Sequence, residues 1–206
     1  MLIKDFQVGQ LQTNCYIVTD ENTLNCVVID PGAESNVMLD YIEEHGLHLK
    51  YILITHGHFD HTTAAEEMQK VSGAPIYISE KDSSRTGSTE HYCFNITADM
   101  DVKHYAEGDS IELDSLHFDV IETPGHSPGS VCLIIENAIF CGDTLFRDSC
   151  GRTDFEDGDV NAILASLLRL DALDGDYEVY PGHMDSTTLN RERRFNYYIN
   201  YAKGAK

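Results

Sequence analysis

Apolar residues recur along this chain in two patterns, and each pattern predicts a different kind of element. Short apolar runs that end at turn residues predict strands, which we place within residues 1–19 with a polar break at 12–14, and at 23–30, 51–54, 75–78, 111–113, 116–120, 131–135, 138–141 and 177–180. Apolar residues three or four positions apart predict helices, which we place at about 38–45, 61–71, 160–168 and 188–201. The mixture indicates an α/β protein.

The order of these elements suggests how they pack. Strands cluster first, helices then intervene, and the order partly recurs. We therefore expect an α/β sandwich in which two sheets pack face to face, formed by a single domain over residues 1–206. Residues 81–101 are polar and have no clear period, which predicts a loop or a broken helix, either a lid or a surface excursion.

Composition and charge limit the partners of the chain. The 206 residues are 42% hydrophobic, yet no apolar stretch approaches the length of a membrane span. The net charge of −21, from 35 acidic and 14 basic residues, argues against nucleic acid and anionic membranes as partners. The N-terminus has no signal-peptide pattern, so we expect a cytoplasmic protein that acts on a small molecule. No feature of the sequence indicates an oligomeric state.

The cysteines do not form a recognisable metal or disulfide motif. They include no Cys-x-x-Cys pair, and several lie inside apolar, strand-like runs. Without an export signal they are expected to be reduced, buried and apolar in character. None is expected to bind a metal as a thiolate: Cys15, Cys26, Cys93, Cys132, Cys141 and Cys150.

The densest group of chemically active residues follows the strand expected at 51–54. Within six positions lie His56, His58, Asp60 and His61. A helix is expected to begin near Asp60, and the junction of a strand with a helix is a usual place for a functional site. Clustered imidazoles repel one another when protonated, and imidazole with carboxylate suits zinc, manganese or iron. The alternative, unrelated surface turn residues, accounts for one histidine better than for three.

Three later strand ends carry single residues of the same kind. His126 and His183 each follow a Pro-Gly turn, and Asp143 follows Gly142. Glycine at these places lets the backbone bend tightly. Seven candidate ligands are too many for one tetrahedral ion and suit two ions that share a carboxylate and a water. The other histidines are isolated and are expected at the surface or in local turns: His45, His48, His91, His104 and His117.

These motifs resemble those of a known family. Residues 55–61 match the His-x-His-x-Asp-His signature of the metallo-β-lactamase superfamily, and the three later residues occur in that family's order. Residues 13–16, 29–32, 123–130, 141–146, 151–154 and 181–196 look like the branch that contains glyoxalase II and its shorter bacterial relatives. The resemblance implies a four-layer αβ/βα sandwich with metals at one edge between the two sheets.

The resemblance also implies a division of the ligands. The first ion would be held by His56, His58 and His126, the second by Asp60, His61 and His183, with Asp143 bridging the two. Asp143 disfavours the many zinc β-lactamases that carry cysteine at this position. His58 disfavours the oxygen-reducing di-iron flavoproteins, which carry glutamate there. Two divalent ions are therefore expected, zinc first, with iron or manganese as alternatives.

The function implied is hydrolysis of a thioester of the glyoxalase II type, S-lactoylglutathione or a related acyl thiol. Two ions about 3.5 Å apart make a bridging hydroxide available near neutral pH, and Asp60 is the candidate catalytic residue that orients it. Full-length glyoxalase II enzymes continue into a helical region with glutathione-binding basic residues, whereas this sequence ends soon after Lys203. Arg147 and Arg152 are therefore candidates to bind a substrate carboxylate.

Other functions remain open at this point. A lactonase or β-lactamase would use the same two metals on a cyclic ester or amide. A persulfide dioxygenase would use a single iron and oxygen. A metal-stabilised interaction module would keep the ligands without catalysis. RNA cleavage, which also occurs in this superfamily, fits poorly with the net charge of −21.

Overall fold

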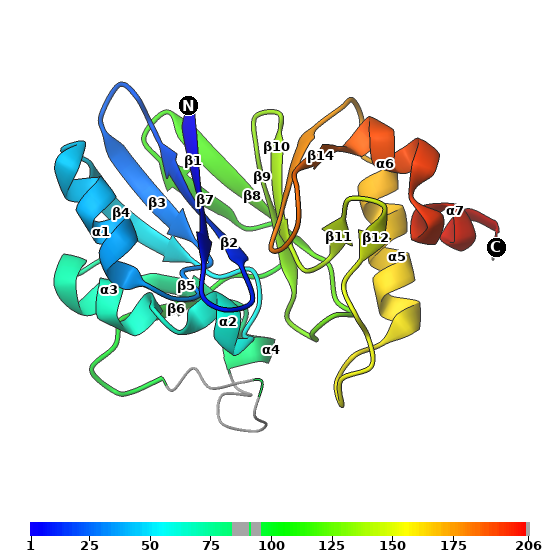
Figure 1. Ribbon diagram of the computed structural model, residues 1–206, viewed down its shortest axis with the longest axis horizontal. Helices are drawn as coiled ribbons and strands as arrows, with labels where there is room; N and C mark the ends of the chain where they lie inside the picture. The colour runs from blue at the N-terminus through cyan, green and yellow to red at the C-terminus, as the bar shows by residue number, and fades with distance from the viewer. Residues whose placement is uncertain (84–90, 92–95, 205–206) are drawn as a thin grey trace.

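Two six-stranded sheets pack face to face in the part of the chain that the structure describes, residues 1–83, 91 and 96–204 of a computed structural model (Figure 1). The first sheet has the strand order β1-β2-β3-β4-β5-β6, in which β1 to β3 are antiparallel and β3 to β6 are parallel. Its strands are β1 (Leu2–Val8), β2 (Thr13–Thr19), β3 (Asn25–Ile29), β4 (His48–Leu53), β5 (Ile76–Ile78) and β6 (Val102–His104).

The second sheet has the order β14-β13-β10-β9-β8-β7. Neighbours from β7 to β10 are antiparallel, whereas β13 is parallel to β10 and antiparallel to β14. Its strands are β7 (Ser110–Leu113), β8 (Leu116–Glu122), β9 (Val131–Ile135), β10 (Ala138–Gly142), β13 (Glu178–Pro181) and β14 (Thr187–Thr188). A small hairpin follows β10 and is formed by β11 (Leu145–Phe146) and β12 (Ser149–Cys150).

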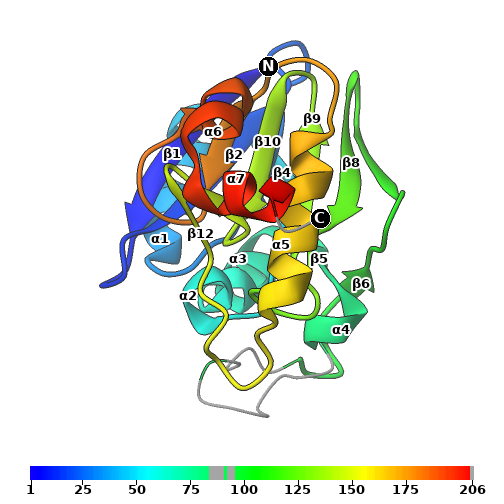
Figure 2. The ribbon, with the colours of Figure 1, turned by 90° about the vertical axis from the view of Figure 1, so that its right-hand side faces the viewer.

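Apolar side chains fill the space between the sheets and under the helices. Val27 and Leu53 of the first sheet belong to one buried cluster with Phe118, Leu133 and Phe140 of the second. Outside the first sheet pack α1 (Ser35–Glu44) and α3 (Ala65–Ser72). Outside the second, as Figure 2 shows, pack α5 (Val160–Asp171), α6 (Leu189–Phe195) and α7 (Tyr197–Gly204). The predicted four-layer αβ/βα sandwich is confirmed.

The turn between the first two strands lies earlier than predicted. It occupies residues 9–12, and the polar residues Thr13 and Asn14 are buried in β2. Their polar atoms have partners, because Thr13 Oγ1 donates to Asp60 at 3.1 Å and Asn14 Nδ2 donates to the carbonyl oxygen of Pro181 at 3.0 Å. Long-range hydrogen bonds of this kind allow polar residues inside a strand.

Two predicted helices are each divided in two. The helix expected at 61–71 is α2 (Phe59–Thr62) followed by α3, and the N–H of Ala64 between them donates to the carbonyl oxygen of Pro31 at 2.9 Å. The helix expected at 188–201 is interrupted at Asn196, whose amide nitrogen donates to the carbonyl oxygens of Phe146 and Ser149. Contacts with distant segments therefore end both helices early.

The stretch predicted as a loop or broken helix begins with a short helix, α4 (Glu80–Ser83). Residues 84–90 and 92–95 of that stretch, which include Cys93, lie outside the described residues. The other five cysteines are free, as expected, and all except Cys150 are buried. None of the helices in the described residues has the length and apolar character that a membrane crossing requires.

Candidate metal centre

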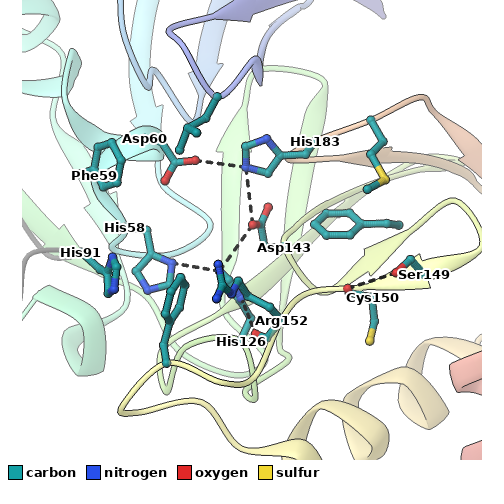
Figure 3. A pocket seen from close by; sticks show the side chains of 14 residues that line it. His58, Phe59, Asp60, His91, His126, Asp143, Ser149, Cys150, Arg152 and His183 are labelled. Carbon is teal, nitrogen blue, oxygen red and sulfur yellow. Dashed lines mark hydrogen bonds and ion pairs between the residues drawn. The ribbon is translucent and has the colours of Figure 1, made fainter.

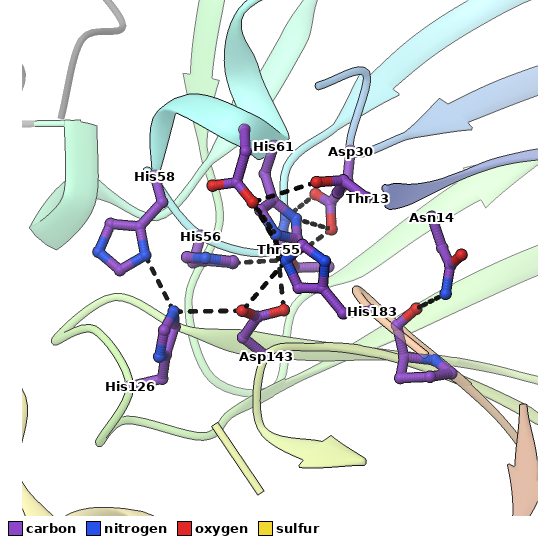
Figure 4. Close-up of polar contacts among 12 residues, drawn as sticks. Thr13, Asn14, Asp30, Thr55, His56, His58, His61, His126, Asp143 and His183 are labelled. Carbon is purple, nitrogen blue, oxygen red and sulfur yellow. Dashed lines mark hydrogen bonds and ion pairs between the residues drawn. The ribbon is translucent and has the colours of Figure 1, made fainter. Parts of the chain in front are cut away.

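Side chains from both sheets meet at one end of the sandwich (Figure 4). The loop after β4 in the first sheet supplies two of them and helix α2, which follows it, supplies two more, while the loops after β8, β10 and β13 in the second sheet supply one each. The structure thus brings together all seven candidate ligands from the sequence: His56, His58, Asp60, His61, His126, Asp143 and His183. Since the loops come from different sheets, it is the face-to-face packing that assembles this cluster.

One group within the cluster consists of three imidazoles. The rings of His56, His58 and His126 lie with their centroids 4.6 to 4.8 Å apart. Nδ1 of His58 is 2.9 Å from Nε2 of His126. All three residues are buried, and each offers one nitrogen within 4.8 Å of the others. This spacing suits a single ion with three nitrogen ligands.

A second group combines one carboxylate with two imidazoles. Oδ2 of Asp60 lies 3.1 Å from Nε2 of His183 and 3.6 Å from Nε2 of His61. A further combination, His56 with His61 and Asp143, connects the two groups, and the rings of His56 and His61 are 4.1 Å apart. The described residues therefore contain His/Asp groups consistent with two neighbouring ions.

Asp143 lies between the two groups. Its Oδ2 is 3.4 Å from Nε2 of His126 and 3.6 Å from Nε2 of His183, while its Oδ1 is 3.5 Å from Nε2 of His61. Gly182 allows this approach, because a Cβ at that position would lie 2.3 Å from Oδ1 of Asp143. One carboxylate thus reaches imidazoles of both groups, which is the position of a bridging ligand.

Unsatisfied polar atoms indicate that the cluster fits a metal. Among the described residues, Nε2 of His56, Nε2 of His61 and Oδ1 of Asp143 are buried without a hydrogen-bond partner. Buried polar atoms nearly always have one. These three atoms come from residues that could hold an ion together. An ion coordinated by them supplies the partner that the protein alone does not.

The two groups differ in the charge of their imidazoles. Burial and the neighbouring imidazoles lower the pKa of His58 to about 3 and hold that of His56 well below its usual range. Burial also disfavours the charged form of His61, but the carboxylates of Asp30 and Asp143 outweigh it and raise the pKa to about 9. His56 and His58 are therefore neutral and ready to bind, whereas His61 holds a proton that an ion must displace.

Asp30 supports the cluster from outside, and the sequence did not identify it as a site residue. Its Oδ2 lies 3.0 Å from Nδ1 of His61 and accepts a hydrogen bond from Oγ1 of Thr55 at 2.6 Å. Its Oδ1 accepts from the N–H of Thr55 at 2.7 Å. Asp30 directly follows β3, so its position at a strand end was the signal that could have revealed it.

Asp82 is a second supporting residue that the sequence did not reveal. It is fully buried in α4, and its carboxylate accepts hydrogen bonds from the N–H of Gly57 at 2.7 Å, the N–H of Gly129 at 2.6 Å and the hydroxyl of Ser127 at 2.7 Å. It therefore joins the loop that carries His56 and His58 to the loop that carries His126. No local pattern in the sequence pointed to it.

A cavity of about 370 Å³ opens beside the cluster (Figure 3). Its walls are largely apolar, and five of the candidate ligands line it: His58, Asp60, His126, Asp143 and His183. The other described lining residues are Leu11, Phe59, His91, Phe146, Ser149, Cys150, Arg152, Phe155 and Met184. The sequence predicted His91 as an isolated residue at the surface or in a local turn, and the structure places it in a turn. In the structure His91 lines this cavity, and its ring centroid is 4.1 Å from that of Phe155.

The two candidate substrate-binding arginines take different places. Arg152 lines the cavity, and its carbonyl oxygen lies 2.8 Å from Nδ1 of His126. Its guanidinium forms two hydrogen bonds with Asp154, at 2.6 and 2.7 Å, and lies 4.2 Å from the ring centroid of Phe155. Arg147 lines a separate pocket and contacts Asp185 at 3.4 Å. The structure does not bring Arg147 into the cavity beside the cluster.

This arrangement of ligands, loops and sheets matches a known family. The sequence model for the metallo-β-lactamase superfamily matches residues 8–183. The chain belongs to this superfamily. The matched range includes all seven candidate ligands, so the predicted resemblance is confirmed.

Individual members of the superfamily resemble the chain over nearly its full length. It is 35% identical over 210 residues to hydroxyacylglutathione hydrolase GloC of Haemophilus influenzae, covering 97% of this chain and 99% of that protein. It is similar to the crystal structure of TTHA1623 in a di-iron-bound form, with a TM-score of 0.81, 34% identity and coverage of 95% and 100%. It is also similar to the BLEG-1 B3 metallo-β-lactamase, with a TM-score of 0.85, 30% identity and coverage of 96% and 99%.

Proposed function

We propose that this superfamily member is a dinuclear metal-dependent hydrolase that cleaves a thioester of the glyoxalase II type, S-lactoylglutathione or a related acyl thiol. The observation that carries the proposal is the position of Asp143, whose carboxylate lies within 3.6 Å of imidazole nitrogens from both groups. Two ions that share a carboxylate are a common arrangement in hydrolases. The similarity to GloC supports a thioester as the bond that is cleaved.

The residues divide between the ions as their grouping suggests. His56, His58 and His126 would hold the first ion, Asp60, His61 and His183 the second, with Asp143 between them. Zinc is the ion we favour, although iron and manganese accept the same donors and the similar TTHA1623 is known in a di-iron form. When bound, two such ions lower the pKa of a shared water and stabilise the negative charge that develops on the acyl oxygen.

Asp60 has a second role in this proposal. It lines the cavity, and its Oδ2 accepts a hydrogen bond from Thr13 at 3.1 Å. Burial opposes its ionisation, but the hydrogen bond with His183 and the charge of His61 keep its pKa well below the usual range. Asp60 is therefore a charged acceptor at neutral pH. It can hold one proton of the attacking water and direct the water's lone pair at the carbonyl carbon.

Cleavage of a thioester bond requires little further catalysis from the other residues. A thiolate is a good leaving group, so its departure does not need a strong general acid. The largely apolar walls of the cavity keep bulk water away from the acyl group. The chain's task is to hold the ligands, orient the attacking water and position the carbonyl group.

A second candidate is hydrolysis of a cyclic amide or ester. The similarity to the BLEG-1 B3 metallo-β-lactamase favours including it, because the identity is 30% over almost the full chain. The same ligands and the same Asp60 would serve that reaction. The two candidates differ in the bond cleaved, so turnover separates them.

The test is a panel of substrates offered to the zinc-, iron- and manganese-loaded protein. We expect turnover of S-lactoylglutathione and of simpler acyl thioesters, and at least tenfold lower kcat/KM for a β-lactam and for a lactone. Asp60→Asn, which keeps the shape of the side chain, serves as the matched inactive control. Turnover of the β-lactam or lactone without turnover of any thioester would overturn the proposal.

A further inference from the structure

We propose that a second cavity beside the candidate metal centre binds an apolar chain of the substrate, so that the substrate carries apolar groups on both sides of its reacting carbonyl. This cavity measures about 380 Å³ and lies between the turn after β1, the loop after β3 and helix α2. The inference rests on the proposed hydrolase function, because it takes Asp60 and its neighbours as the place of reaction. It adds the class of substrate.

The two cavities meet at three residues. Leu11, Phe59 and Asp60 line both of them. Figure 3 shows Phe59 and Asp60 at the edge of the first cavity, with Asp60 pointing towards His183. A carbonyl group placed beside Asp60 is therefore next to both cavities, and one of its two substituents can extend into each.

The second cavity has an apolar lining. Val8, Leu11, Ala33 and Phe59 contribute most of its hydrophobic side chains. Leu11 and Phe59 are 55% and 37% exposed and both line this cavity, so together they present apolar surface to water. A hydrophobic chain that lies against them removes this surface from water, which favours binding.

The charge of the second cavity disfavours an anionic substrate arm. Among the described residues that line it, Asp60 is the one charged side chain, and it is an anion. The adjacent N–H of Gly9 donates to another carboxylate, that of Glu34, at 2.7 Å. A substrate arm that carries carboxylates finds no cationic side chain among the described residues of this cavity. An uncharged aliphatic chain meets no such repulsion.

The first cavity does not reverse this preference. Arg152 carries the one guanidinium among its described lining residues, and both oxygens of Asp154 already accept hydrogen bonds from it. Phe146 and Phe155 add apolar surface to the lining of this cavity. Both cavities therefore offer largely apolar surface, and among the acyl thioesters proposed above the geometry favours tightest binding of those with an aliphatic or aromatic chain on each side.

The test measures binding and does not depend on turnover. The probes are non-hydrolysable thioethers of N-acetylcysteamine with butyl and octyl chains, titrated calorimetrically into the zinc-loaded protein. We expect the octyl probe to bind at least tenfold more tightly than the butyl probe, because each buried methylene strengthens binding by up to about fourfold. Equal binding of the two probes by the wild-type protein would overturn the inference.

Two variants assign that preference to the second cavity. Thr63→Phe and Gln10→Phe place a ring in the cavity from opposite walls, and both positions are exposed, so that the fold accepts them. In each variant, we expect the octyl probe to bind less than about threefold more tightly than the butyl probe. Val71→Phe is the matched control, because Val71 is 67% exposed at the end of α3 and lines neither cavity. It should keep the wild-type ratio.

The outcomes separate the inference from the function on which it rests. Retention of the wild-type ratio by both cavity variants overturns the inference, even where thioesters are hydrolysed. A chain-length preference that both variants abolish supports the second cavity, even where no thioester in the panel is turned over. In that case only the proposed reaction is lost.

Discussion

Oδ2 of Asp30 lies 3.0 Å from Nδ1 of His61 and determines which way that imidazole faces. With Nδ1 held by the carboxylate, Nε2 of His61 points to Asp60 and Asp143, 3.6 and 3.5 Å away. The carboxylate is itself held by the N–H and hydroxyl of Thr55. A residue outside the proposed ligand set thus orients a proposed ligand, as is usual for histidines that bind metals.

The first prediction concerns this contact. Asp30→Asn is expected to weaken zinc binding about 10- to 100-fold, which is the usual effect of removing the carboxylate behind a ligating histidine. Competition with a chromophoric chelator measures the affinity. Asp20→Asn is the matched control, because Asp20 is also buried but accepts its hydrogen bonds from Asn22 and Ser115 away from the cluster. Equal losses in both variants would remove the orienting role from Asp30.

The second prediction concerns Asp82. In Asp82→Asn the new amide cannot accept all the hydrogen bonds that come from Gly57, Gly129 and Ser127. We expect the free energy of unfolding of the metal-free protein to fall by about 2–3 kcal/mol, because a buried donor is left without an acceptor. Urea unfolding measures it. Asp119→Asn on the exposed side of β8 should change it little, and an equally small change in both variants would contradict the prediction.

The third prediction is release of protons on metal binding. Burial opposes the charged forms of His61 and His183, but nearby carboxylates raise both pKa values, that of His61 to about 9. A raised pKa means that His61 is protonated at pH 7 and must lose that proton to bind an ion. Calorimetry of zinc binding in buffers of different ionisation enthalpy should therefore show at least about one proton released at pH 7.

That release should decrease as the pH rises above 9, because His61 is then already neutral in the metal-free protein. The affinity for zinc should rise as the pH increases towards 9 and level off above it. Neutral His58, with a pKa of about 3, contributes no proton at pH 7. Heats that do not depend on the buffer at pH 7 would contradict this account of the second group.

The fourth prediction concerns Arg152. Since Arg152 lines the cavity while its charge is shared with Asp154, Arg152→Ala should raise KM for an acidic thioester by about two- to fivefold, the range of an exposed ion pair. KM for a neutral thioester should change less. Arg147→Ala is the matched control, because Arg147 lines a separate pocket. Equal changes for both substrates would exclude Arg152 from carboxylate binding.

Local patterns predicted the parts of this protein that depend on local sequence. The strand at 116–120 and the helix at 160–168 were predicted, and both depend on local features: Phe118 and Val120 are buried in β8 between exposed residues, and Asp159 caps α5 by accepting from two backbone N–H groups. The candidate ligands stood out because each follows a strand. The interruption at Asn196 and the buried hydrogen bonds of Asp82 could not be predicted from local sequence. The carbonyl oxygens that Asn196 contacts lie 47 and 50 positions away, and the partners of Asp82 lie 25 to 47 positions away.

The central claim is that Asp143 joins two ions into one hydrolytic centre. Its most direct test is metal content measured together with thioester hydrolysis for the wild-type protein and Asp143→Ala. We expect about two ions per wild-type chain and, in the variant, loss of most bound metal and of hydrolysis with an unchanged circular dichroism spectrum, because the residue lies in a loop. A variant that keeps its metal and its full activity would contradict the bridged centre.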